Sequence, residues 1–182
     1  MKIESREYKV IVDVALFADF DAALAEMSAD LQGLVESLEF SLDGEFDIDE
    51  REEQSIRFLD TRDFTLRRNS LLLRQRIKLK NDKTEYTLKC RTADRYFSAL
   101  RNLEPAQGLK ADHKFEEDIG APFVSGFSQS TTVKLKPDDS FAGDSWPRTL
   151  AEGSQLFPLL SETECDGLRC SGDTPLAVVN GR

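Results

Sequence analysis

Residues 73–80 read LRQRIKLK, so every second position holds a cation. Side chains alternate between the two faces of a β-strand, and the alternation therefore predicts a strand with one strongly basic face. Like charges in a row repel one another unless an anion neutralises them. The cations that share this face are Arg74, Arg76, Lys78 and Lys80.

Residues 84–91, TEYTLKCR, repeat the pattern and place Lys89 and Arg91 on one face. Residues 81–83, NDK, are typical of a tight turn, so the two strands are predicted to form an antiparallel hairpin. The basic faces of the two strands are then expected to line the same space on one side of the hairpin. A positive surface of this breadth is too large for a single carboxylate partner and indicates a phosphate-rich ligand.

Charge is distributed unevenly along the chain. The 182 residues carry a formal net charge of −10, yet residues 57–91 hold eleven Lys and Arg against four Asp and Glu, a local charge of +7. An acidic protein with one basic segment is unsuited to nonspecific binding of DNA or of an anionic membrane surface, because its overall field repels polyanions. The pattern favours a small, highly charged anion held in an enclosed site.

Cysteine and hydropathy patterns narrow the class of protein further. Cys90, Cys165 and Cys170 match no zinc-site spacing in a chain with a single histidine. The N-terminus has no signal-peptide pattern, and no apolar run approaches the roughly 18 residues that span a bilayer. We therefore predict a cytoplasmic protein with no membrane segment and with reduced thiols.

The remaining elements are predicted from periodicity and turn residues. Leu24, Met27, Leu31, Leu34 and Leu38 follow a helical spacing within a predicted helix over 20–40. The acidic run at 43–53 is predicted to be a solvated loop or hairpin. We further expect strands at 5–14, 55–61, 72–80, 84–91 and 114–119, helical turns at 64–70 and 96–103, and a short helix within 149–160.

Five short motifs occur in an order that resembles the CYTH, or triphosphate tunnel metalloenzyme, superfamily. That superfamily begins with a Glu-x-Glu-x-Lys strand, for which this chain has SREYK. Its later motifs, Tyr-Phe-Asp-Thr-like, Leu-Arg-x-Arg, Thr-Leu-Lys and basic-x-Glu, correspond here to RFLDT, LRQR, TLK and KFE. The resemblance covers about residues 5–119; the matching segments are 5–9, 57–61, 73–76, 87–89 and 114–116.

The resemblance implies an α+β fold dominated by an antiparallel β-barrel-like tunnel with helices outside, formed by a single domain over 1–182. It implies a metal-dependent phosphohydrolase for inorganic triphosphate, polyphosphate or an organic triphosphate, with Mg²⁺ or Mn²⁺ as cofactor. Lys9 would be the catalytic residue that polarises the attacking water. The metal ligands would be Glu7, Glu116 and Asp118, and the phosphate-binding residues would be Arg57, Arg74, Arg76, Lys89 and Arg91.

Two departures from the family pattern leave alternatives open. Ser5 stands where the family has its first glutamate, and a serine cannot neutralise a divalent ion as a carboxylate does. Residues 120–182 contain no clear equivalent of the family's last strands, so this part is expected to be divergent or truncated, and the unpaired sheet edges favour a homodimer. The alternatives are a non-catalytic module that binds polyphosphate or a nucleotide and, on weaker grounds, a CYTH-type adenylyl cyclase.

Overall fold

The computed structural model describes residues 2–9, 13, 15, 18–40, 53–165 and 167–179. Contacts divide the chain into two compact units, one formed by residues 1–9 and 52–182 and the other by residues 10–51. In chain order the elements are β1 (Ser5–Lys9), α1 (Phe20–Ser37), β2 (Gln54–Asp60), α2 (Thr65–Arg68), β3 (Leu71–Lys78), β4 (Lys83–Thr92), α3 (Arg95–Leu100), β5 (Ala111–Gly120), β6 (Val124–Leu135), α4 (Leu150–Gly153), η2 (Pro158–Glu162), β7 (Glu164–Cys165), β8 (Leu168–Arg169) and β9 (Ala177–Val178).

The smaller unit contains the predicted helix. Helix α1 begins after Asp19, whose carboxylate accepts a hydrogen bond from the backbone N–H of Ala22 at 3.1 Å, as an N-cap residue does. It ends at Ser37, so the predicted helix over 20–40 is confirmed for most of its length. The predicted acidic loop at 43–53 lies outside the described residues except for its last position.

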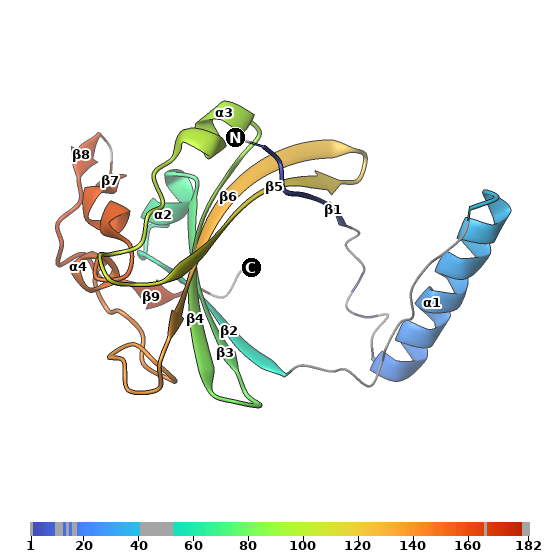
Figure 1. Ribbon diagram of the computed structural model, residues 1–182, viewed down its shortest axis with the longest axis horizontal. Helices are drawn as coiled ribbons and strands as arrows, with labels where there is room; N and C mark the ends of the chain where they lie inside the picture. The colour runs from blue at the N-terminus through green and yellow to red at the C-terminus, as the bar shows by residue number, and fades with distance from the viewer. Residues whose placement is uncertain are drawn as a thin grey trace. The chain divides into compact units, whose positions relative to one another are not determined.

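The larger unit is built on a curved seven-stranded sheet in the order β1-β5-β6-β4-β3-β2-β9 (Figure 1). All neighbouring pairs in it are antiparallel except β1 with β5, which is parallel. The mixed α+β class and the β3–β4 hairpin are therefore confirmed. In the described residues β1 and β9 do not pair with each other, so the sheet is open and does not close into the barrel-like tunnel that the resemblance implies.

One face of the sheet carries the hydrophobic core. The alternate residues of β3 and β4 that are not cations, among them Leu73, Leu88 and Cys90, are almost fully buried there. The segment after β6 covers this face, with Phe157 and Leu160 packed in the same cluster. Residues predicted as one helix within 149–160 instead form α4 and η2, with Pro158 at the start of η2.

A polar pair lies inside this core. The amide nitrogen of Gln75 donates to the hydroxyl of Tyr86 at 2.8 Å and to the carbonyl of Ser145 at 2.6 Å. The Tyr86 hydroxyl also lies 3.0 Å from the carbonyl oxygen of Phe141. Burial raises the pKa of Tyr86, which keeps this side chain a neutral donor. The pair anchors the loop around residues 141–145 to the back of the sheet.

Replacement of Tyr86 by Phe is expected to destabilise the fold by about 1–3 kcal/mol, because buried partners lose a hydrogen bond without gaining water. The measurement is the free energy of unfolding in urea. Tyr96→Phe is the matched control, since Tyr96 is 76% exposed and should change stability by less than about 0.5 kcal/mol. Equal effects of the two substitutions would contradict the anchoring role of the Tyr86 hydroxyl.

Candidate functional site

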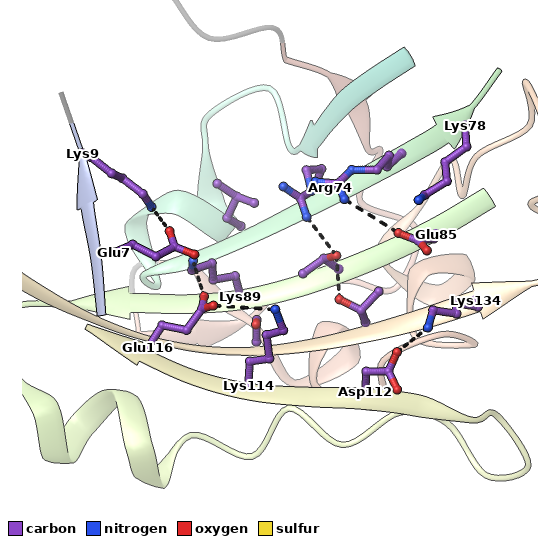
Figure 2. A pocket seen from close by; sticks show the side chains of 15 residues that line it. Glu7, Lys9, Arg74, Lys78, Glu85, Lys89, Asp112, Lys114, Glu116 and Lys134 are labelled. Carbon is purple, nitrogen blue, oxygen red and sulfur yellow. Dashed lines mark hydrogen bonds and ion pairs between the residues drawn. The ribbon is translucent and has the colours of Figure 1, made fainter. Parts of the chain in front are cut away.

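The other face of the sheet forms a cavity of about 580 Å³, whose walls are strands β1, β3, β4, β5 and β6 (Figure 2). Among its described lining residues, seven are cations and four are carboxylates, a net charge of +3 in a chain of net charge −10. The cations are Lys9, Arg74, Arg76, Lys78, Lys89, Lys114 and Lys134. The carboxylates are Glu7, Glu85, Asp112 and Glu116.

Strand register brings these side chains to one face. Strand β4 lies between β3 and β6, and its pairing sets Thr87 opposite Arg74 on one side and opposite Thr132 on the other. Strand β1 is aligned with β5, so that Ser5 faces Glu116. Because side chains alternate along each strand, these cross-strand partners share the cavity face.

At one end of this face, the carboxylate of Asp118 is surrounded by cations. Its side chain is only 1% exposed and accepts a hydrogen bond of 2.5 Å from Lys9 Nζ, while Arg91 Nε lies at 3.3 Å and Lys89 Nζ at 3.9 Å. Burial by itself would raise the pKa of Asp118, but the Lys9 hydrogen bond and the charges of Lys89 and Arg91 hold it below its ordinary value. Asp118 is therefore ionised and ties β1 and β4 to β5.

Lys9, the predicted catalytic residue, lines the cavity and is paired on two sides. Its ammonium lies 2.9 Å from Glu7 and 2.5 Å from Asp118. Burial lowers the pKa of Lys9, but the two carboxylate hydrogen bonds outweigh it and raise that pKa overall. Lys9 is thus a protonated, positioned cation.

Glu116 is a further paired carboxylate of this end. It is 6% exposed, accepts a hydrogen bond of 3.3 Å from the Ser5 hydroxyl, and lies 3.5 Å from Lys89 Nζ and 3.9 Å from Lys114 Nζ. The two lysines thus neutralise the charge of this carboxylate. Figure 2 shows Glu7, Lys9, Lys89 and Glu116 gathered at this end of the cavity.

The predicted metal ligands Glu7, Glu116 and Asp118 therefore do not fit a resident Mg²⁺ or Mn²⁺ site. The described residues contain no group of three or more His, Cys, Asp or Glu side chains that could hold a metal ion. A hard divalent cation needs several oxygen ligands free to face it, and here lysine ammonium groups neutralise those oxygens. Ser5, at the position where the CYTH pattern has its first glutamate, donates a hydroxyl hydrogen bond to Glu116 and supplies no second carboxylate.

Further along β3, the two arginines have few anionic partners among the described residues. The Arg74 guanidinium donates a long hydrogen bond of 3.4 Å to Thr87, and Arg76 lies 3.9 Å from Glu85. In the described part of the chain the Nε atoms of both arginines are buried without a hydrogen-bond partner. Burial, followed by the charge of Arg76, lowers the pKa of Arg74. An anion would stabilise this arginine pair most, because its buried Nε–H groups have no acceptor among the described residues.

Two of the predicted phosphate-binding residues lie outside the cavity lining. Arg91 shares the Lys89 face but extends beyond the cavity to Asp118. Arg57 lies opposite Gln75 in the β2–β3 register, which turns it to the core face. There it pairs with Asp144 at 2.5 Å and lies 5.1 Å from the Trp146 ring centroid. Arg57 therefore lies outside the candidate site. Of the predicted phosphate-binding residues, Arg74, Arg76 and Lys89 line the cavity.

The cavity also contains residues that are not among the predicted site residues, although one of them, Lys114, is the basic residue of the KFE motif. Lys114 and Lys134 come from β5 and β6, and Asp112 pairs with Lys134 at 2.5 Å. Lys134 lies in a stretch whose alternation, TVKLK, carries a weak signal of the same kind as the β3 pattern. Alternation along the strand predicted over 84–91 already places Glu85 on the face of Lys89. Asp112 precedes the strand predicted over 114–119, and only the structure shows that it lines the cavity.

No family model, curated protein or solved structure matches this chain. In the described residues no helix is long and apolar enough to cross a membrane.

Replacement of Asp118 by Asn is expected to destabilise the fold by about 2 kcal/mol at neutral pH, since it removes charge-assisted hydrogen bonding between strands. Because folding lowers the pKa of Asp118, its contribution is complete above the unfolded value of about 3.9 and disappears as pH falls through the folded pKa. The difference between wild type and Asp118→Asn in urea unfolding should therefore shrink below about pH 4.

The exposed Asp173 provides a matched control for that measurement. Asp173→Asn should leave stability at neutral pH within about 0.5 kcal/mol of wild type. A constant difference between wild type and Asp118→Asn from neutral to strongly acidic pH would show that the ionised carboxylate is not what stabilises this end of the sheet.

Proposed function

We propose that this protein binds a chain of phosphate groups, as in inorganic triphosphate, polyphosphate or an organic triphosphate, within the basic cavity. The observation that carries the proposal is the Arg74–Arg76 pair, whose buried Nε donors have no acceptor in the described residues. Buried polar atoms without a partner are costly, and a phosphate oxygen is a geometrically matched acceptor for these Nε–H groups.

The charge and shape of the cavity support a phosphate chain over a single carboxylate. Cations from five different strands surround the space, so that an elongated anion can contact several of them at once. The rigid strands hold the cations in place before the ligand arrives, which reduces the entropy lost on binding. The negative charge of the rest of the protein repels a long nucleic acid. It repels a compact ligand inside the cavity less, because the cavity cations are closer to that ligand.

Binding is better supported than metal-dependent hydrolysis, the leading prediction from the sequence. The carboxylates that would hold the metal are paired with lysines. Hydrolysis and CYTH membership stay predictions, as does cyclase activity. A divalent cation that arrives bound to the phosphate chain belongs to the substrate, and the hydrolysis test below includes that case.

Tripolyphosphate is expected to bind wild-type protein, and Arg74→Gln should raise the Kd about 10- to 100-fold, because hydrogen bonds to charged groups contribute ~1.5–3 kcal/mol. Isothermal titration calorimetry in EDTA at two salt concentrations measures this. The matched control is Arg169→Gln, which removes the same charge from an exposed position on β8 outside the cavity.

The proposal would be wrong if tripolyphosphate did not bind wild type, or if Arg74→Gln and Arg169→Gln weakened binding equally. The second result would mean that only the overall charge matters. Citrate, a compact anion without phosphate, should bind more weakly than tripolyphosphate at equal ionic strength, because fewer of the cavity cations can contact it.

Release of inorganic phosphate from tripolyphosphate distinguishes binding from hydrolysis. We expect none above background with EDTA, Mg²⁺ or Mn²⁺, because the described carboxylates do not form a metal site. Release that requires Mg²⁺ or Mn²⁺ and is lost in Lys89→Ala would overturn this expectation and favour the phosphohydrolase. Circular dichroism of Lys89→Ala confirms that the variant is folded.

A further inference from the structure

A second cavity, of about 280 Å³, lies beside the end of β3 near α2 and has a different chemical character. Its walls are mainly apolar and include the side chains of Phe58, Phe64, Leu72 and Val179, with Arg67 as the one cation among its described lining residues. A volume near the lower end of the ~300–1,000 Å³ typical of ligand pockets suits a group of one or two rings.

The apolar cavity and the basic cavity share one lining residue. Leu72 lines both of them and is 40% exposed. In the β2–β3 register Phe58 lies directly opposite Arg74, so an aromatic ring of the apolar cavity and a cation of the basic cavity are cross-strand neighbours on the same face. A ligand that fills both cavities would therefore have a charged part joined to an apolar part.

The wall formed by α2 is held in place by a buried carboxylate. Asp60 is 5% exposed and accepts hydrogen bonds from the backbone N–H groups of Thr61 at 2.7 Å, Leu66 at 2.8 Å and Arg67 at 3.1 Å. These bonds secure both ends of the turn that carries Phe64. The apolar cavity is thus formed before any ligand binds, which lowers the entropic cost of binding.

Phe64 itself adopts a conformation that its own chemistry does not favour. Its backbone has φ 57 in the left-handed region, which is uncommon for a non-glycine residue and unfavourable for a bulky side chain. Its ring is nevertheless 44% exposed at the cavity and not buried in the core. Backbone strain clusters at ligand-binding sites, and Phe64, unlike the similarly strained and exposed Phe123, lines the apolar cavity.

We propose that the ligand is an organic phosphate ester whose compact aromatic or apolar group occupies the apolar cavity while its phosphate chain occupies the basic cavity. This inference rests on the proposed function and narrows it, since inorganic polyphosphate has no apolar part with which to fill the second cavity. The shared lining residue Leu72 and the Phe58–Arg74 pairing place the two cavities side by side, which favours this occupant over a side chain of a protein partner.

Three ligands that share a triphosphate test the inference by titration calorimetry in EDTA: tripolyphosphate, methyl triphosphate and phenyl triphosphate. The two esters carry the same ionisable groups and differ in the apolar group alone. Phenyl triphosphate should bind wild type about tenfold more tightly than methyl triphosphate, because burial of apolar surface contributes about 25 cal/mol per Å².

Two variants locate the origin of that preference. Phe64→Ala, at an exposed position, and Phe58→Ala should each reduce the phenyl-to-methyl ratio to less than threefold while the affinity for tripolyphosphate stays within twofold of wild type. Unchanged affinity for tripolyphosphate also shows that the variant is folded. The control is Phe123→Ala, because Phe123 is likewise at positive φ and 85% exposed but lines neither cavity.

The outcomes separate this inference from the function on which it rests. Equal affinity of wild type for the phenyl and methyl esters, with tripolyphosphate bound, would overturn the inference alone and leave the apolar cavity to a protein partner. A preference for the phenyl ester that survives in both Phe64→Ala and Phe58→Ala would also overturn it. Failure of all three ligands to bind would overturn the proposed function and this inference together.

Discussion

The structure depends on the register in which β3 pairs with β4. This register places the cations of the hairpin that line the basic cavity on the same face of the sheet. The same register sends Leu73, Leu88 and Cys90 to the opposite face, where they form the centre of the core. A slip of one residue in either strand would bury its cations and expose its apolar side chains. Hydrophobic burial on one face therefore enforces the concentration of positive charge on the other.

Concentrated charge has to be compensated, and the protein does so unequally along the cavity. Near β1, the carboxylates of Glu7, Glu116 and Asp118 neutralise the lysines and hold a short edge strand that buries little apolar surface. Near the middle of β3, Arg74 and Arg76 receive little compensation. The first arrangement stabilises the sheet. The second is the part of the cavity on which the proposed binding of a phosphate chain rests.

The apolar cavity lies beside the charged one and differs from it in polarity. The turn between β2 and β3 is held by Asp60 and presents Phe64 in a strained conformation beside the cation-rich strand. A site with a polar part and an apolar part next to each other is specific for ligands that combine both properties, because a ligand with only one of them leaves half of the site unsatisfied.

Three features were predictable from the sequence, because each depends on a pattern among neighbouring residues. They are the strands with a strict two-residue alternation, the α1 helix and the basic character of one sheet face. Most of β6 escaped prediction because its central residues Ser128, Gln129 and Ser130 are polar yet buried between two partner strands. Three features follow from the tertiary structure and not from local patterns. Arg57 faces the core, lysine ammonium groups pair with the predicted metal-ligating carboxylates, and an apolar cavity lies beside the basic one. These features depend on register and on contacts between residues far apart in the chain, which local periodicity does not encode.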